Sequence, residues 1–308
     1  MSTPCSKCGK PAVYLRRYTM EQLCKSCLVK TTQLRVQKTI NKGKMLREDD
    51  RIAVAISGGK DSAVLLEILV QIEKDYPRTE LAPLTIDEGI KGYRDRALEA
   101  ARELCSKLDL ALEVRTFKDL FGHSLDWIVE NRENSSTGAC SYCGVLRRQA
   151  LNTAALEIEA DVVVTGHNLD DEAQTVVMNV MRGDSRRIAR TNRSQEFPIP
   201  GLVPRAKPIK ELSERDIVAY AYYLHLPYHD VTCPYAEEAY RNDIRTFLNE
   251  MEHKRPGTLL AILRSGDAIA EIYELLPQVA RIHKCVSCGM PTSKKICKAC
   301  SLLAEFGG

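Results

Sequence analysis

The chain has 308 residues, of which 44% are hydrophobic and 28% charged, a size that suits one large domain with small appendages. Its longest apolar run, near residues 63–70, contains Glu67, and its first residues form no apolar leader, so we expect a cytoplasmic protein rather than a membrane or secreted one. The net charge of +3 conceals an asymmetry, because residues 1–47 carry eleven Lys and Arg against one acid while residues 48–280 carry 28 against 39. The basic ends favour a polyanionic partner, with a merely solvated surface as the alternative.

Eight of the twelve cysteines form C-x-x-C pairs near the two ends of the chain. Because the cytoplasm keeps thiols reduced, metal ligation is a better interpretation than disulfide bonding. The first two pairs are separated by fifteen residues, a spacing typical of zinc sites, and four thiolates make a closed tetrahedral site. We predict a structural zinc ion bound by Cys5, Cys8, Cys24 and Cys27, with iron binding or redox chemistry as the minor alternative.

Residues 31–48 are basic and have apolar residues at near-helical spacing, which predicts a helix leading into the central part of the chain. From Arg51 to Gly183, apolar runs alternate with amphipathic segments. The predicted strands are residues 51–57, 81–86, 111–117 and 161–166, and the predicted helices are residues 61–76, 93–108, 140–158 and 171–183. This alternation predicts a parallel sheet with helices on both faces, and such sheets bind ligands at the carboxyl ends of their strands.

Residues 184–208 are polar and rich in proline, which predicts a loop, and the chain from Ser213 onward has a helical pattern. Two more cysteine pairs follow with an eight-residue spacer. We predict a second structural zinc ion bound by Cys285, Cys288, Cys297 and Cys300.

These patterns divide the chain into five expected segments. They are a zinc module at 1–30, a basic linker helix at 31–48, a central α/β domain at 49–212, its helical C-terminal part at 213–280 and a zinc ribbon at 281–308. The basic residues of the terminal modules are candidates for RNA phosphate contacts, namely Lys7, Lys10, Arg16, Arg17, Lys284, Lys294, Lys295 and Lys298.

The sequence SGGKDS, residues 57–62, lies between a predicted strand and a predicted helix. Its glycines let backbone N–H groups face an anion, the helix N-terminus adds a favourable dipole, and Lys60 adds a positive charge. It is not a Walker loop, which has a longer segment between its glycines. A simple tight turn is the alternative, but the complete hexapeptide favours a phosphate-binding loop.

A second motif, TGHNLDDEA at residues 165–173, falls at the end of another predicted strand. Asp171 is a candidate to hold Mg²⁺ or the nucleotide, since Mg²⁺ prefers carboxylates and phosphates. Capping of the following helix is a compatible alternative for this carboxylate. His167 is interpreted as structural, and we assign it no catalytic role.

The interior of the chain holds three further cysteines: Cys140 and Cys143 form a C-x-x-C pair, and Cys233 follows ninety residues later. Three thiolates are too few for a closed zinc site, but they can hold a [4Fe–4S] cluster with one iron open to a hydrosulfide. Persulfide chemistry and simple packing of buried thiols are the alternatives. Arg147 supplies nearby positive charge for a thiolate, a phosphate or RNA. Cys105 stands alone in an amphipathic segment and is expected in the core.

SGGKDS and TGHNLDDEA resemble motifs of the PP-loop ATP pyrophosphatases, which cleave ATP between the α and β phosphates and transfer AMP to a substrate oxygen. Together with DEGIKGYRD, CSYCGVLRR, MNVMRGD and CPYAEEAYR, they make nearly the whole chain similar to PP-loop tRNA 2-thiolation enzymes of the TtuA, NcsA and cytosolic thiouridylase subunit 1 group. The resemblance implies a Rossmann-like parallel sheet of the PP-loop type, flanked by N- and C-terminal zinc ribbons. DEGIKGYRD and MNVMRGD are closer to the wobble-uridine branch than to the T-loop branch.

The resemblance also implies an activity: ATP-dependent tRNA uridine 2-sulfurtransfer, in which the uridine C2 oxygen is adenylated and then replaced by sulfur, with release of PPi and AMP. It assigns a [4Fe–4S] cluster to Cys140, Cys143 and Cys233. The implied nucleotide contacts are Ala55, Ser57, Gly58, Gly59, Lys60, Asp61, Ser62, Ile86, Arg147, Gly166 and Asp171. We expect Lys60, Asp61 and Asp171 to act in catalysis with the three cysteines, and ATP to bind with Mg²⁺.

The expected partner is tRNA, with a ubiquitin-like sulfur carrier or free sulfide as the sulfur donor and a homodimer as the assembly. The alternatives are thiolation of a T-loop 5-methyluridine, another PP-loop modification such as cytidine thiolation or amino-acid ligation, and a zinc-ribbon nucleic-acid-binding protein with a regulatory ATP site. A sulfur-free ligase does not need the interior cysteines. ATP-to-AMP turnover that depends on tRNA would exclude the binding protein.

Overall fold

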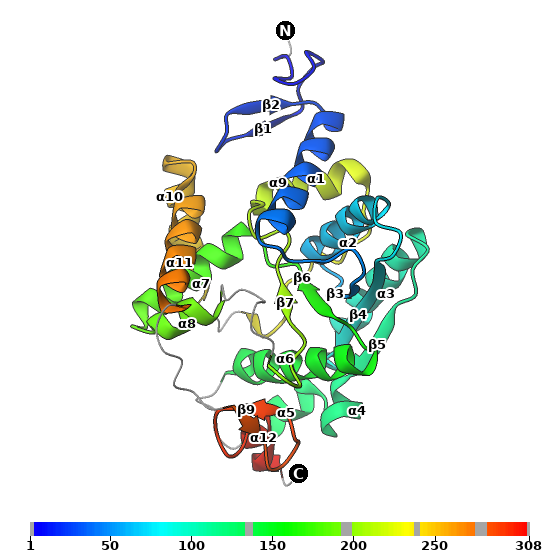
Figure 1. The fold of residues 1–308 in the computed structure, drawn as a ribbon, viewed down its shortest axis with the longest axis vertical. Helices are drawn as coiled ribbons and strands as arrows, with labels where there is room; N and C mark the ends of the chain where they lie inside the picture. Colours follow the sequence, from blue (N-terminus) through cyan, green and yellow to red (C-terminus); the bar gives the residue numbers. More distant parts are fainter. Residues whose placement is uncertain (1–2, 133–137, 192–198, 237–240, 275–281, 307–308) are drawn as a thin grey trace.

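The computed structural model describes residues 3–132, 138–191, 199–236, 241–274 and 282–306 (Figure 1). Its centre is a five-stranded sheet in the order β5-β4-β3-β6-β7, in which all neighbouring strands are parallel. The strands are β3 (Arg51–Ala55), β4 (Glu80–Asp87), β5 (Glu113–Thr116), β6 (Val162–Thr165) and β7 (Arg205–Ala206). From β3 the successive strands β4 and β5 are added on one side, whereas β6 and β7 are added on the other side. Sheets of this type bind ligands at such a switch point, here between β3 and β6.

Helices surround this sheet, and two small hairpins stand at the ends of the molecule. The helices are α1 (Lys25–Lys42), α2 (Lys60–Glu73), α3 (Arg94–Lys107), α4 (Phe117–Phe121), α5 (Leu125–Asn131), α6 (Ala139–Glu157), α7 (Leu169–Met181), α8 (Ser185–Thr191), α9 (Glu214–Leu224), α10 (Arg241–Lys254), α11 (Thr258–Glu274) and α12 (Lys298–Leu303). The hairpins pair β1 (Tyr14–Arg16) with β2 (Glu21–Leu23) and β8 (His283–Lys284) with β9 (Pro291–Thr292). Within the described part of the chain, no helix combines the length and the apolar character that crossing a bilayer requires.

Alternate side chains of the central strands feed two separate cores. Ile52 and Val54 point into a core formed with α1, α2, α3 and α9, whereas Ala53 points into a core formed with α5 and α6. All three are fully buried. Burying a side chain such as Val or Ile contributes about 1.5–3 kcal/mol, so the sheet is held from both faces. The prediction of a parallel sheet covered on both faces is confirmed.

Helices α7, α10 and α11 form a third apolar cluster that lies beside the sheet rather than on it. Leu169 and Ala173 of α7 pack there against Ile244 and Leu248 of α10. This arrangement fixes the start of α7, which directly follows β6, next to the start of α10. Residues from two distant parts of the sequence therefore meet at the carboxyl edge of the sheet.

The N-terminal module is anchored to α9 by a buried ion pair. Arg16 donates from Nε to Asp216 Oδ1 at 3.0 Å, and both side chains are almost completely buried, at 1% and 0% exposure. Tyr14 and Tyr18 donate their hydroxyls to the same carboxylate. Burial and the Asp216 charge raise the pKa of both tyrosines, so both remain neutral donors. Our prediction that Arg16 contacts RNA is therefore wrong, because its guanidinium is enclosed by protein.

The C-terminal module packs against α6. Ala299 and Leu302 of α12 belong to the same core as Leu146 and Ala150 of α6. Tyr142 in α6 also donates its hydroxyl to Glu305 Oε2 at 2.7 Å. The C-terminal module thus supports helix α6, whose N-terminal part carries Cys140 and Cys143.

Two local predictions differ from the structure. The predicted loop at 184–208 contains helix α8 and the edge strand β7, whose two residues pair with Val163 and Val164; part of this loop, residues 192–198, lies outside the described residues. The basic helix predicted at 31–48 begins earlier, because Cys24 is its N-cap and the helix runs without interruption from Lys25 to Lys42. Strand β7 could not be predicted, because its two residues are too few to show the alternating pattern of a strand. The five-segment division of the chain stays a prediction.

Candidate active site

The phosphate-loop motif forms a closed turn between β3 and α2. Ser62 Oγ accepts from Ser57 N at 3.1 Å and donates to the Gly59 carbonyl at 2.9 Å. Gly58 has φ +86°, and a Cβ atom there would lie 2.2 Å from the Ala97 carbonyl oxygen in α3. Only glycine fits this position, because both the backbone conformation and the space exclude a side chain. The turn leaves the N-terminus of α2 facing the carboxyl edge of the sheet.

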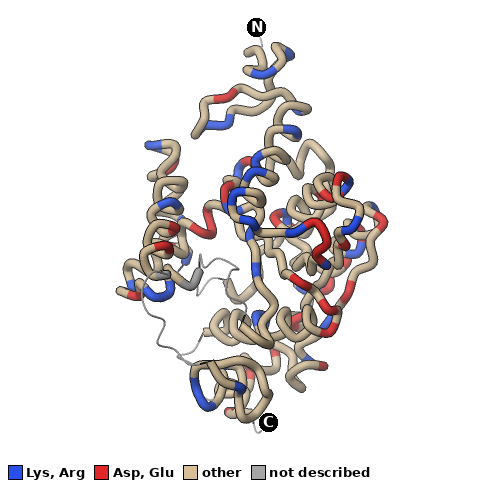
Figure 2. Tube along the Cα trace, in the orientation of Figure 1, with Lys and Arg blue, Asp and Glu red and all other residues tan. Residues whose placement is uncertain are grey.

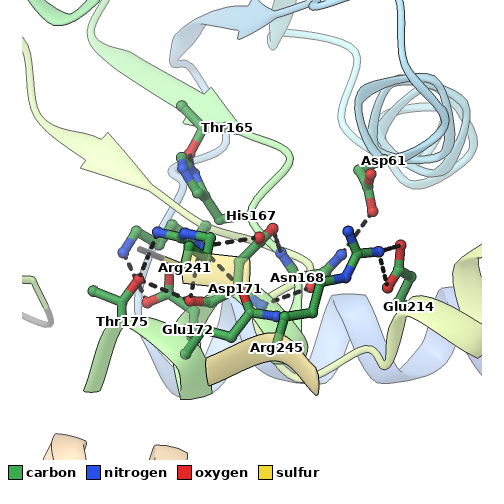
Figure 3. Close-up of polar contacts among 12 residues, drawn as sticks. Asp61, Thr165, His167, Asn168, Asp171, Glu172, Thr175, Glu214, Arg241 and Arg245 are labelled. Carbon is green, nitrogen blue, oxygen red and sulfur yellow. Dashed lines mark hydrogen bonds and ion pairs between the residues drawn. The ribbon is translucent and has the colours of Figure 1, made fainter. Parts of the chain in front are cut away.

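Charged side chains surround this helix N-terminus (Figure 3). Lys60 Nζ lies 3.1 Å from Asp61 Oδ2 and 2.8 Å from Glu214 Oε1, so its charge is shared between two carboxylates. Burial alone would lower the pKa of Lys60, but Asp61 and Glu214 outweigh it and raise this pKa above its usual value. Asp61 Oδ1 also accepts from Asn168 Nδ2 at 2.7 Å, which connects the loop to the start of α7.

Asp171 occupies the third position of α7, where it takes part in a capping box with Asn168. Its carboxylate also lies 3.3 Å from Arg241 Nη1, at the start of α10 (Figure 3). Burial and the nearby Asp61 raise the pKa of Asp171, and Arg241 only partly offsets them. Two carboxylates crowded beside a phosphate loop fit a site for Mg²⁺, which would relieve their repulsion.

A cavity of about 400 Å³ opens at this edge of the sheet, above the ends of β3, β4 and β6. This volume is in the range of small-molecule sites. The predicted nucleotide residues that line it are Ala55, Ser57, Asp61, Ser62, Ile86, Arg147, Gly166 and Asp171. Gly58, Gly59 and Lys60 lie in the loop but not in the cavity wall. His167 also lines the cavity, although from its sequence context we interpret it as structural.

His167 extends from the end of β6 and bonds through Nδ1 to Thr165 Oγ1 at 2.8 Å (Figure 3). Loss of hydration within the cavity wall, together with the positive charge of Lys207, lowers the pKa of His167 to about 4. Its ring is therefore neutral at physiological pH and adds no charge to the cavity.

One buried carboxylate, Glu88, joins the two sides of this cavity. Its Oε2 lies 3.0 Å from Arg94 Nε, and its Oε1 lies 2.8 Å from Arg147 Nε. Arg94 donates in turn to the carbonyl of Ser57 at 2.6 Å, so it holds the phosphate loop. Arg147 donates from Nη2 to Cys143 Sγ at 2.9 Å. A continuous chain of charged contacts thus runs from the phosphate loop to an interior cysteine.

The three interior cysteines come together at the N-terminus of α6. Cys140 Sγ lies 3.4 Å from the carbonyl of Tyr235, two residues from Cys233. Burial raises the pKa of Cys143 and of Cys233; the neighbouring Cys233 adds to the rise for Cys143, and Cys140 adds to the rise for Cys233. The three sulfur atoms do not all lie within 4.8 Å of one another, unlike the terminal sets. Wider spacing fits thiolates that bind different irons of one cluster, so this donor set suits a [4Fe–4S] group.

The terminal cysteines form two compact sets, Cys5, Cys8, Cys24 and Cys27, and Cys285, Cys288, Cys297 and Cys300. Within each set all four sulfur atoms lie within 4.8 Å of one another, as a single tetrahedral ion requires. Hydrogen bonds from Ser26 and from the backbone lower the pKa of Cys24 to about 6, and backbone N–H groups do the same for Cys285. Each set therefore fits the zinc ion that the sequence predicts.

Glu88, Arg94, Asn168, Glu214 and Arg241 belong to the site but were not predicted as site residues. Glu88, Arg94 and Arg241 occur in the family-like stretches DEGIKGYRD and CPYAEEAYR, so a sequence pattern marked their location without giving a role. Glu214 lies in α9 and reaches Lys60 across 154 positions of the sequence. Only the folded chain reveals that contact.

Comparison with known proteins finds relatives from the family that the sequence motifs resemble, and they match almost the whole chain. A family model described as a PP-loop domain matches residues 28–252. Cytoplasmic tRNA 2-thiolation protein 1 of Aspergillus niger is 37% identical over 98% of this chain and 88% of its own length. The tRNA 2-thiolation protein NcsA of Haloferax volcanii is 37% identical over 98% of both chains.

A solved structure agrees with these sequence relatives. It is the U34-tRNA thiolase NcsA of Methanococcus maripaludis with its [4Fe-4S] cluster, which is 31% identical and superposes with a TM-score of 0.85 over 98% of this chain and 96% of its own. The match includes both terminal modules, because almost nothing of either chain is left out. The chain therefore belongs to the PP-loop family and, within it, to the tRNA 2-thiolation proteins that include NcsA and cytoplasmic tRNA 2-thiolation protein 1.

Proposed function

We propose that this protein is an ATP-dependent tRNA uridine 2-sulfurtransferase that acts in the cytoplasm, with the wobble uridine as its target. One observation carries the proposal: the cavity beside the phosphate loop also borders the cysteine helix, since Arg147 lines it and bonds Cys143. Activation by ATP and delivery of sulfur therefore fit in a single site. The relatives' names, and the solved U34-tRNA thiolase in particular, support the substrate and the position.

In the first step, ATP lies with its phosphates at the N-terminus of α2. The backbone N–H groups of residues 57–62 face the phosphates, and Lys60 exchanges Asp61 or Glu214 for a phosphate oxygen as ATP enters. Asp61 and Asp171 would hold Mg²⁺, which would neutralise negative charge on the phosphates. The C2 oxygen of the uridine attacks the α-phosphorus, and PPi leaves. Holding the two reactants in line is the main contribution of such a site.

In the second step, a sulfur nucleophile attacks C2 and AMP leaves with the former C2 oxygen, so the uracil base gains one sulfur and loses one oxygen. When bound, a [4Fe–4S] cluster held by Cys140, Cys143 and Cys233 would supply an iron position without a protein ligand, to which the donor sulfur binds. Arg147 lies between Cys143 and Glu88 and keeps a positive charge beside the cavity. That charge stabilises the AMP phosphate as it departs.

The two zinc modules hold the ends of the chain in place rather than take part in the reaction, because four thiolates leave no open metal position. We assign tRNA as the partner, and a ubiquitin-like sulfur carrier protein or free sulfide as the sulfur donor. A homodimer remains the proposed assembly.

The proposal is tested by anaerobic incubation of the iron-loaded protein with an unmodified tRNA transcript, ATP, Mg²⁺ and sulfide. Mass spectrometry of the digested RNA measures 2-thiouridine, and chromatography of the nucleotides measures AMP. We expect one AMP for each 2-thiouridine. AMP formation without 2-thiouridine would instead assign a different PP-loop modification, and the absence of both would contradict an enzymatic role.

A further inference from the structure

A second and larger cavity, of about 1,140 Å³, lies between α6, α7, α8 and the C-terminal module. Among the residues that the structure describes, its lining includes four basic residues, Arg148, Arg187, Lys294 and Lys298, and no acidic one. Five further lining residues carry a hydroxyl or an amide, and the remaining two are Val145 and Ile296. We call this cavity the basic groove. Lys, Arg, Ser, Thr and Asn are the side chains that contact phosphate and sugar in nucleic-acid complexes.

In the described part of the chain, neighbouring acids balance only part of the positive charge of the basic groove. Among the described residues, no carboxylate lies within ion-pair distance of Arg148, Lys294 or Lys298, whereas Arg187 pairs with Asp184 at 3.0 Å. Burial and the charges of Arg147 and Arg187 lower the pKa of Arg148. Burial and Arg148 lower the pKa of its neighbour Arg205 to about 10. Arginines held this close together repel one another unless an anion binds between them. Their clustering therefore indicates an anion-binding surface.

The basic groove adjoins the active-site cavity along two edges. Arg147 lines the active-site cavity and the next residue, Arg148, lines the groove. On the opposite side, Thr175 lines the groove and accepts from Arg241, which lines the active-site cavity, at 3.3 Å. A polyanion that lies in the groove therefore passes directly beside the nucleotide and the cysteine helix.

We propose that the basic groove binds the sugar–phosphate backbone of the substrate RNA and that the C-terminal module, with Lys294 and Lys298, forms one of its walls. This inference rests on the proposed function for the identity of the RNA. An acidic protein such as a sulfur carrier is the other possible class of partner. The groove favours RNA because hydroxyl and amide groups, which suit phosphate and ribose, outnumber its apolar residues by five to two.

The C-terminal module supplies a matched pair of variants. Lys294→Gln with Lys298→Gln removes two charges from the groove. Lys284→Gln with Lys295→Gln removes two charges from the same module, at sequence-predicted candidates for RNA contacts that do not line the groove and that this proposal therefore places outside the RNA path. All four lysines are exposed, so neither pair disturbs the core. Zinc content and ATP affinity confirm that each variant is folded.

The measurement is the affinity for an unmodified tRNA transcript by fluorescence anisotropy at several salt concentrations, without ATP or sulfide. For the groove pair we expect affinity to fall about tenfold at 0.1 M salt and the slope of log K against log salt to decrease by about 1 to 2. The control pair at Lys284 and Lys295 should change the affinity and the slope much less. Arg148→Gln should lower the slope by about 1.

Two results would overturn the inference. Equal effects of the two pairs would show that the RNA responds only to overall charge. Unchanged tRNA binding in the groove pair, together with weakened binding of an acidic carrier protein, would assign the groove to that protein. The binding assay measures neither ATP turnover nor thiolation. The groove can therefore be disproved while the proposed function stands, and the proposed function can be disproved while RNA binding in the groove stands.

Discussion

The terminal and the interior cysteines use the same C-x-x-C spacing for different purposes. Each terminal set brings four sulfur atoms within 4.8 Å of one another, at the periphery of the molecule (Figure 1). The interior set has three cysteines, a wider spacing and a position beside the cavity, where Arg147 contacts Cys143. Under the proposed cluster assignment, the number of thiolates and their surroundings, not the local motif, separate a structural site from a reactive one.

Charge distribution follows the same division. Figure 2 shows acidic residues frequent around α3 and β5, and basic residues on α1, α8 and the C-terminal module. The terminal modules thus combine closed cysteine sets with positive charge, whereas the interior set lies where acidic and basic side chains are paired. Four substitutions test this division between the two kinds of cysteine site.

Cys143→Ser should abolish 2-thiouridine formation, reducing it by more than about a hundredfold, because two thiolates cannot hold the cluster. Iron should be lost while the zinc content stays at that of the unmodified protein. The matched control is Cys105→Ser: Cys105 is 2% exposed in the core, and burial raises its pKa to about 11, so it is chemically inert. Retained thiolation in the Cys143 variant would show that this cysteine is only a packing residue.

Cys288→Ser should release one zinc ion and unfold the C-terminal module, because metal binding contributes on the order of 10 kcal/mol to such modules. Iron content should persist, since Cys140, Cys143 and Cys233 are intact, whereas tRNA affinity should fall with loss of the groove wall. Metal analysis and limited proteolysis check this. Loss of iron with retention of both zinc ions would reverse the assignment of the two kinds of site.

Asp216→Ala should lower the free energy of unfolding by about 3–5 kcal/mol, since Arg16 would remain buried with only Glu21, at 3.5 Å, as its counter-charge. Chemical denaturation measures the change. Asp267→Ala is the control, because Asp267 is 31% exposed and pairs with Lys210 at 3.4 Å, so its removal should cost less than about 1 kcal/mol. Similar losses in both variants would mean that the N-terminal module is not anchored through Asp216.

Glu88→Gln should slow thiolation about tenfold, equivalent to about 1.4 kcal/mol, because Arg94 and Arg147 lose the charge that orients both. Zinc content should change little, whereas the free energy of unfolding should fall, by less than the about 3–5 kcal/mol of a fully broken buried pair, because the buried Arg94 loses its charged partner while Gln still offers it an oxygen acceptor. Glu157→Gln is the control: Glu157 is 45% exposed and pairs with Arg115 at 2.9 Å, away from the cavity. An unchanged rate in the Glu88 variant would show that the phosphate loop and Cys143 are positioned independently.

Much of this molecule follows from local sequence patterns. Alternation of apolar and amphipathic segments predicts β3, α2, β6 and α7, and the glycines of residues 57–62 predict the phosphate loop, because these features depend on neighbouring residues. The spacing of Cys5, Cys8, Cys24 and Cys27 predicts the first zinc set for the same reason.

The remaining features depend on contacts that no local pattern encodes. Lys60 contacts Glu214, and Asp171 contacts Arg241, only because α9 and α10 return to the carboxyl edge of the sheet. Arginine is usually found on the surface, yet Arg16 is buried where it pairs with the equally buried Asp216. The sheet strand β7 was missed because its two residues depend on pairing with β6 rather than on their own pattern.

We propose that three interior thiolates beside the ATP cavity hold an iron–sulfur cluster while the eight terminal thiolates hold zinc. The most direct test is anaerobic purification followed by measurement of iron, acid-labile sulfide and zinc in one sample. We expect about four irons, four sulfides and two zinc ions per chain. Two zinc ions without iron or sulfide would contradict it and would move the sulfur chemistry to a cysteine persulfide.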